Sequence, residues 1–155
     1  MPTIRRAKTE ADLDAARRLF RAYVEGLDFD LAFQEFEAEM RALPGPYAPP
    51  NGAILLADVE ETPVGVVAVQ PLHEEGVCEM KRLYVRPAHR GQGLGRALAS
   101  ALIEEARALG YHTMRLDTVP SMTAARRLYR SLGFEERGAY YHNPLPEAVY
   151  MERAL

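Results

Sequence analysis

Apolar residues recur along this chain with two different spacings, and each spacing predicts a type of element. Leu13, Ala16, Leu19, Phe20 and Val24 follow the three-and-four spacing of a helix with one buried face. Short runs rich in β-branched residues, bounded by Gly, Pro or Asn, are typical of strands. The patterns predict strands at 2–7, 53–59, 64–70, 77–85, 112–118, 134–140 and 148–155, and helices at 10–26, 30–43, 96–109 and 121–132.

The order of these elements predicts a mixed α/β fold, with a central sheet of about seven strands flanked by about four helices. A chain of 155 residues with 48% hydrophobic content is the right size for a single domain spanning residues 1–155. The segment 44–52 is rich in proline, which removes backbone donors, so we expect a loop without regular structure there. It is not a domain linker, because the strands that follow are needed to complete the core.

The overall charge and the lengths of the apolar runs indicate which partners and which compartment to expect. A net charge of −3 gives no bulk attraction to nucleic acid or to an anionic membrane, so neither is expected as a partner. No apolar run approaches the roughly 20 residues of a membrane span, and the first residues lack the apolar stretch of a signal peptide. We therefore expect a soluble, cytoplasmic protein. The spacing of the histidines matches no metal site, and none is assigned.

Cys78 is the only cysteine, which excludes an intramolecular disulfide. Its position within an apolar strand favours a small buried hydrophobic side chain over a reactive thiol. A free thiol fits a reducing compartment without proving one.

The most informative segment is Arg90-Gly91-Gln92-Gly93-Leu94-Gly95-Arg96, which lies between a predicted strand and a predicted helix. Such a turn directs backbone N–H groups and the positive end of a helix toward a phosphate, and glycine lets the backbone approach the anion. The P-loop of NTPases requires a Lys that is absent here, and the dinucleotide motif requires a Gly where Arg96 stands. A simple tight turn before a surface helix is the structural alternative.

The same segment fits the pattern Arg/Gln-x-x-Gly-x-Gly/Ala of GNAT-type N-acetyltransferases. The similarity includes Leu83-Tyr84-Val85 before the loop and a helix ending in Leu128-Tyr129 and Gly133-Phe134 behind it. These motifs cover roughly residues 76–135, in the order and separation found in the family. The chain therefore resembles a GNAT-superfamily member, and the predicted element order matches the GNAT fold.

The resemblance implies acetyl-CoA as the co-substrate. Its pyrophosphate is expected on the N–H groups from Gln92 to Arg96, and its pantetheine arm beside the backbone of Leu83 to Val85. Arg90 and Arg96 flank the loop and would add positive charge at the phosphates. Ordinary solvation on the surface is the alternative for both arginines. The predicted cofactor-binding residues are Leu83, Tyr84, Val85, Arg90, Gly91, Gln92, Gly93, Leu94, Gly95 and Arg96.

Two side chains are the predicted catalytic residues. Glu79 stands on an apolar strand, where a carboxyl group is costly to bury without a purpose, and family members use a Glu there as the base, directly or through water. Alternatively, Glu79 pairs with Lys81, with Arg82 or with an arginine of a neighbouring strand. Tyr129 corresponds to the family's acid, which protonates the leaving thiolate; its alternative role is packing. The family's Asn seven residues earlier is replaced by Met122.

The acceptor site is expected between two segments that wall it in GNAT folds. The predicted substrate-binding residues are Phe33, Glu37, Tyr141 and His142, with a packed, proline-stiffened turn as the alternative for the last two. The resulting hypothesis is transfer of an acetyl group to a primary amine of a small molecule by direct attack in a ternary complex. Protein N-terminal or lysine acetylation and a non-catalytic acyl-CoA-binding module are the alternatives, and a homodimer is compatible with the family.

Overall fold

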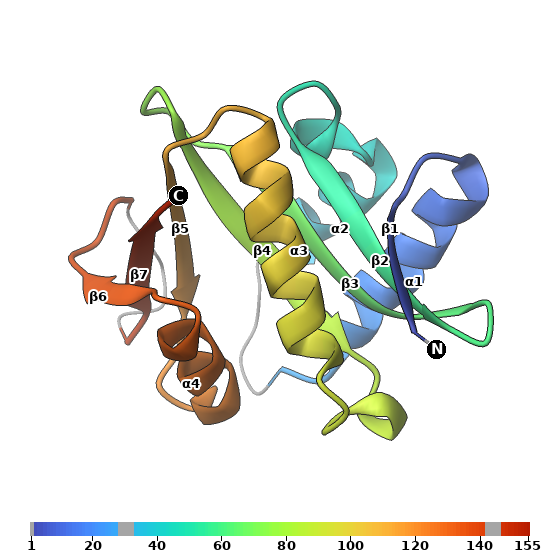
Figure 1. Ribbon diagram of the computed structural model, residues 1–155. Coiled ribbons are helices and arrows are strands. Elements are labelled where there is room, and N and C mark those ends of the chain that lie inside the picture. The colour runs from blue at the N-terminus through green and yellow to red at the C-terminus, as the bar shows by residue number, and fades with distance from the viewer. Residues whose placement is uncertain (1, 28–32, 142–146) are drawn as a thin grey trace.

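The computed structural model describes residues 2–27, 33–141 and 147–155, which form a seven-stranded mixed sheet and four α-helices. Figure 1 shows α3 crossing one side of the sheet and α1 and α2 on the other. The predicted element order and fold class are confirmed. The elements are β1 (Thr3–Arg6), α1 (Glu10–Glu25), α2 (Phe33–Ala42), β2 (Ala53–Val59), β3 (Thr62–Pro71), β4 (Val77–Val85), α3 (Leu94–Ala108), β5 (Thr113–Thr118), α4 (Thr123–Ser131), β6 (Glu135–Arg137) and β7 (Val149–Ala154).

The strands lie in the order β1-β2-β3-β4-β5-β7-β6, and every neighbouring pair is antiparallel except β4 and β5. This parallel pair is joined through α3, which follows the usual rule that parallel strands need a crossover connection. None of the described helices is long and apolar enough to cross a membrane.

The two faces of the sheet carry separate apolar cores, because successive side chains of a strand point to opposite faces. The core beneath α3 includes Cys78, Met80 and Val85 of β4. The core beneath α1 and α2 includes Val66 and Ala68 of β3. Cys78 is fully buried and its thiol lies 3.5 Å from the carbonyl oxygen of Thr113, so the predicted buried position is confirmed.

A β-bulge interrupts the pairing of β3 with β4. Val66 and Ala68 lie two positions apart, yet their partners Tyr84 and Lys81 lie three positions apart. The extra residue on β4 brings Arg82 to a φ of 62°, a left-handed conformation that is uncommon for a residue other than glycine. As a result, Lys81 and Tyr84 point to the same face of the sheet.

The second notable feature of β4 is the edge that it shares with β5. The two strands pair only from Val77 to Glu79, opposite Thr113 to Arg115. From Met80 onward β4 has β3 on one side and no strand of the described chain on the other. The sheet therefore contains an internal edge of backbone N–H and C=O groups.

Two predicted segments differ from the structure. The predicted strand at 134–140 is shorter, because after Arg137 the chain turns so that Tyr140 packs its ring over Arg115. The loop at 44–52 was expected to lack regular structure, but residues Gly45–Tyr47 form a 3₁₀ turn. Proline at an early position fits such a turn, since its φ is already fixed near the helical value.

Candidate functional site

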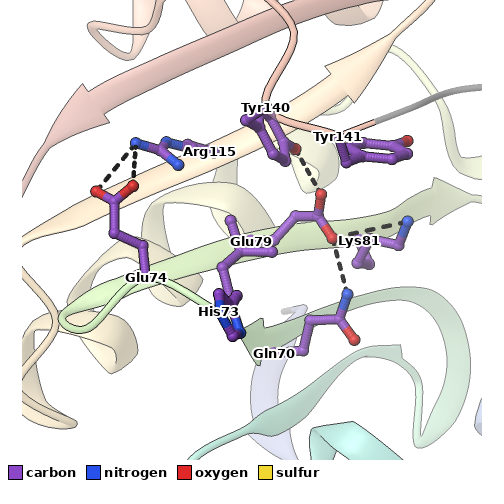
Figure 2. Close-up of a pocket in the computed structure, with 9 residues that line it drawn as sticks. Gln70, His73, Glu74, Glu79, Lys81, Arg115, Tyr140 and Tyr141 are labelled. Atoms are coloured by element: carbon purple, nitrogen blue, oxygen red, sulfur yellow. Dashed lines mark hydrogen bonds and ion pairs between the residues drawn. The ribbon is translucent and has the colours of Figure 1, made fainter.

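A cavity of about 470 Å³ opens on the sheet face opposite α3, where β4 and β5 begin to separate. Strands β3, β4 and β5 supply its floor, and two tyrosines from the segment after β6 supply a wall. Figure 2 shows these side chains around the carboxylate of Glu79. The lining residues are Gln70, Leu72, His73, Glu74, Glu79, Lys81, Arg115, Tyr140 and Tyr141.

Glu79 is the buried carboxylate of this cavity, with only 3% of its surface exposed. Its Oε1 accepts a hydrogen bond from Gln70 Nε2 at 2.8 Å, and its Oε2 accepts one from the Tyr140 hydroxyl at 2.5 Å. Lys81 Nζ lies 3.8 Å from Oε1. Gln70 is the register partner of Glu79 on β3, so the sheet itself fixes this contact. Both oxygens are therefore partnered, as burial of a carboxylate requires.

Arg115 lies beside Glu79 because the two are register partners on the parallel pair of strands. Its Nε donates to Glu152 at 2.9 Å, and its guanidinium lies 5.4 Å from the ring centroid of Tyr140. Tyr140 thus contacts Arg115 with its ring and Glu79 with its hydroxyl. Burial, reinforced by the charge of Glu79, raises the pKa of Tyr140, so its hydroxyl remains a hydrogen-bond donor.

The glycine-rich loop forms the N-terminal end of α3. Gly93 is the N-cap residue in a left-handed conformation, with φ of 83°, and no side chain caps the helix. The first hydrogen bond of the helix runs from Ala97 N to Gly93 O, so the preceding N–H groups have no partner within the helix. A Cβ added at Gly91 or Gly93 would meet no atom within 4 Å, which means that the loop faces open space. This geometry fits a phosphate group.

The two arginines of the loop are already bound within the protein. Arg90 Nε donates to the carbonyl of Val85 at 2.9 Å, and its guanidinium lies 5.5 Å from the ring of Tyr84. Arg96 Nη2 donates to Ser131 Oγ at 2.8 Å, which joins α3 to α4. These contacts hold the loop between β4 and α4, and a role at phosphates stays a prediction.

Residues 83–85 of β4 lie on the internal edge of the sheet. Leu83 and Val85 pack toward α3, while Tyr84 packs on the opposite face against Tyr23, with 6.1 Å between ring centroids. No strand of the described chain pairs with them on the β5 side, where the Val85 carbonyl is already bound to Arg90. The rest of this edge suits pairing with an extended chain that carries amides, as a pantetheine arm does.

Comparison with known proteins agrees with this geometry. Residues 13–134 match the model of the acetyltransferase (GNAT) family. The chain belongs to the GNAT family of acetyltransferases. It is 43% identical over 150 residues to an uncharacterised N-acetyltransferase of Schizosaccharomyces pombe, covering 96% of this chain and 92% of the relative.

Solved structures of GNAT-like proteins resemble the whole chain. A Klebsiella pneumoniae protein described as an acyl-CoA N-acyltransferase is 36% identical, with a TM-score of 0.74, covering 100% of this chain and 98% of that one. A Salmonella typhimurium protein described as an acetyltransferase was solved with its cofactor acetyl-CoA. It is 25% identical with a TM-score of 0.74, and the match covers 99% of this chain and 94% of that one. Acetyl-CoA is the cofactor implied for a GNAT enzyme with this loop.

Tyr129, the GNAT acid candidate, lies on α4 outside the residues that line the cavity. Its ring packs edge-on against Phe134, with centroids 5.9 Å apart. Burial raises its pKa, with smaller contributions from Tyr23 and Asp117. The hydroxyl has no hydrogen-bond partner among the described residues, so both predicted roles, packing and proton donation, are compatible with its position.

Met122 stands at the N-cap of α4, where the GNAT pattern has Asn. Its sulfur lies 3.4 Å from the hydroxyl oxygen of Thr118, and no side chain caps the helix. The usual capping contribution of Asn is therefore missing at this position.

The predicted acceptor residues are not all brought to the cavity. Tyr141 lines it and donates to Asp117 Oδ2 at 2.7 Å. Glu37 binds Arg21 at 2.5 Å and is not among the lining residues. Phe33 is the first residue of α2, but its side chain lies outside the described part of the chain, as does the whole of His142.

Sequence reasoning left the partners of Glu79 open and missed much of the cavity. The pairing with Lys81 is present, whereas Arg82 binds Glu39 instead. The arginine of a neighbouring strand is Arg115, which lies opposite Glu79 but binds Glu152 and Glu74. Gln70 was not predicted. Gln70 ends an apolar run in β3, and Arg115 stands at a polar position of the alternating strand β5. Neither signal reveals the register that places each residue beside Glu79.

Proposed function

We propose that this GNAT protein transfers an acetyl group from acetyl-CoA to the primary amine of a small molecule, by direct attack in a ternary complex. The observation that carries the proposal is the Glu79 carboxylate, which is buried yet opens into a cavity where β4 leaves β5. A buried, hydrogen-bonded carboxylate beside the internal edge of the sheet is suited to acid–base chemistry.

Acetyl-CoA supplies the acetyl group as a thioester, so transfer forms a C–N bond and breaks a C–S bond, with CoA released as the thiol. Before the attack, the acceptor ammonium must lose a proton. Glu79 accepts that proton, directly or through one water molecule, while Gln70 and Tyr140 hold its two oxygens in place. Tyr129 donates its proton to the leaving sulfur, so that CoA leaves as the thiol, and the second proton that the nitrogen loses on becoming an amide returns to the phenolate. Burial raises the pKa of Tyr129, so the phenol is protonated before the transfer.

The state of Cys78 supports direct attack over an acetyl-enzyme intermediate. Burial raises the pKa of this thiol to about 12, and a thiol that stays protonated is a weak nucleophile. Cys78 also points into the core beneath α3, away from the cavity face.

The size of the cavity supports a small acceptor. A volume of about 470 Å³ falls within the range of roughly 300–1,000 Å³ that is usual for small-molecule sites. A protein N-terminus or lysine remains the alternative acceptor, and peptides therefore belong in the same assay.

The test is CoA release from acetyl-CoA with a panel of small amines, amino acids and short peptides, with mass spectrometry of the acetylated product. We expect turnover with small amines, and a loss of about 10²–10⁴ in kcat for Glu79→Gln. Glu104→Gln, on the exposed side of α3, is the matched control and should retain full activity. Turnover that survives unchanged in Glu79→Gln would remove the base role, and exclusive turnover of peptides would replace the small acceptor.

A further inference from the structure

Arg115, at one end of the cavity, shares its carboxylate partner Glu152 with a second arginine. Arg115 and Arg137 both bind the same oxygen, Oε1 of Glu152, at 2.9 and 2.8 Å. The only other carboxylate bound to Arg115 within the described residues is Glu74, which belongs to the turn between β3 and β4. This end of the cavity therefore carries a guanidinium whose second anionic partner comes from an exposed turn.

The guanidinium of Arg115 is held in place from several sides. Its side chain is only 11% exposed, its Nε is fixed by Glu152, and the ring of Tyr140 packs against it. Such support leaves the orientation of the group largely independent of any ligand. A pre-oriented guanidinium is the preferred protein group for binding a carboxylate.

The contact between Arg115 and Glu74 is weak by comparison. Nη2 lies 3.4 and 3.3 Å from the two oxygens of Glu74, longer than a usual charge-assisted hydrogen bond. The side chain of Glu74 is 62% exposed, so it loses little by turning toward solvent. Figure 2 shows this pair at the opposite end of the cavity from Lys81.

We propose that Arg115 binds a carboxylate of the acceptor, and that the acceptors are amino acids or similar compounds that carry an amine and a carboxylate on a short carbon chain. Glu74 occupies this carboxylate site when no acceptor is present. The inference rests on the proposed function, since it assigns the second group of an acceptor whose amine lies at Glu79.

The spacing of the two strands supports this class of acceptor. Glu79 and Arg115 are register partners on neighbouring strands, which lie about 4.8 Å apart. Their side chains rise from the same face of the sheet and line the same cavity. A compound with an amine and a carboxylate close together matches a carboxylate and a guanidinium placed side by side.

The experiment compares each amino acid with its carboxamide, which keeps the amine and the size but removes the negative charge. We expect kcat/KM to be about 10- to 100-fold higher for the amino acid than for its carboxamide, which is the effect of losing one charge-assisted hydrogen bond. Arg115→Gln should abolish this preference, lowering kcat/KM for the amino acid at least tenfold more than kcat/KM for its carboxamide. Arg115→Lys should restore part of it, and Arg107→Gln, on exposed α3, is the control.

Glu74→Gln provides a second variant, at an exposed residue whose contact with Arg115 is long. It removes the competing charge from an exposed turn, so the KM for amino acids should fall several-fold. The KM for carboxamides should fall less, so the ratio of the two KM values is the readout. An equal fall in KM for an amino acid and for its carboxamide would contradict the inference.

Binding measured by saturation-transfer NMR in the presence of CoA separates the two proposals, because no acetyl group is then available. Binding of amino acids over carboxamides that is lost in Arg115→Gln supports the carboxylate site even if nothing is acetylated. Equal binding and equal acetylation of both members overturn the inference and leave the acetyltransferase standing. Absence of any binding that depends on the carboxylate overturns it as well.

Discussion

Arg82 binds Glu39 through two nitrogens, with Nε 2.9 Å from Oε2 and Nη2 2.8 Å from Oε1. The pair joins the bulge of β4 to α2, and the guanidinium also lies 5.2 Å from the ring of Phe36. Burial raises the pKa of Glu39, but the hydrogen bonds from Arg82 outweigh it and the net shift is downward. The ion pair thus holds Arg82, the left-handed residue of β4, against α2.

Loss of either partner of this pair should destabilise the fold, because the other charge is left poorly solvated. We expect Arg82→Met and Glu39→Gln each to cost about 3 kcal/mol in the free energy of unfolding. The double variant should cost less than the sum, since it leaves no unpaired charge. Urea unfolding measures all three. The exposed pair Arg107 and Glu104 is the control. Substitution of either residue should lower the free energy of unfolding by less than about 1 kcal/mol, and the coupling energy between the two substitutions should also stay below that value.

Tyr129→Phe tests the proton donor without disturbing the packing on Phe134. The ring remains, so the melting temperature and the shift caused by acetyl-CoA should stay close to those of the wild type. If the hydroxyl protonates the leaving thiolate, kcat should fall by about 10²–10⁴. Steady-state CoA release measures the effect. Undiminished turnover would leave Tyr129 with the packing role alone.

Gly93→Ala tests the loop as an anion-binding site. The left-handed conformation at φ of 83° should cost about 1 kcal/mol of stability with a side chain present. A methyl group there also points into the open space in front of the helix, so the apparent Kd for acetyl-CoA should rise at least tenfold. Isothermal titration calorimetry gives the Kd. Gly138→Ala is the control, since it likewise meets no atom within 4 Å and its φ is not in the left-handed region.

Asp12 links the stability of α1 to pH. The backbone N–H of Lys8 and the guanidinium of Arg5 lower the pKa of Asp12 to about 2, against an opposing effect of burial. A carboxyl group with a lowered pKa stabilises the fold above its unfolded pKa of about 4 and loses that contribution as pH falls toward 2.

Asp12→Asn should therefore cost about 1 kcal/mol at neutral pH, where the capping box with Thr9 is intact, and progressively less below pH 4. Urea unfolding across this range gives the difference between the two proteins. A difference that stays constant down to pH 2 would show that the charge of Asp12 does not contribute. Glu10→Gln, in the same first turn, controls for a general effect of acidic residues at the helix start.

The local signals of the sequence were sufficient for the fold and for the glycine-rich turn before α3. The spacing of apolar residues changes where a strand ends and a helix begins. Thr9 and Asp12 form a helix-capping pattern, which predicts the start of α1 at the position where it is found. Gly91 and Gly93 were singled out because glycine lets the backbone approach an anion, and both adopt left-handed backbone in the structure. These features depend on neighbouring residues, so a single sequence is enough to find them.

The proposed acceptor cavity depends on contacts that no local pattern contains. Glu79 meets Gln70 and Arg115 through strand register, and it meets Tyr140 across 61 positions of sequence. The alternation of a strand tells which residues share a face, but the bulge at Arg82 reverses that alternation part-way along β4. The pattern of apolar residues alone could not locate that reversal.

The bulge has a consequence for how such an enzyme can change. It divides β4 into two segments that are out of phase, one carrying Glu79 and Lys81 and the other carrying residues 83–85. Substitutions in the first segment and in the turn at Glu74 can reshape the acceptor cavity without altering the backbone edge or the loop of α3. One strand thus keeps the residues of the proposed acceptor cavity apart from those beside the α3 loop, so acceptor preference can change without a change in the loop.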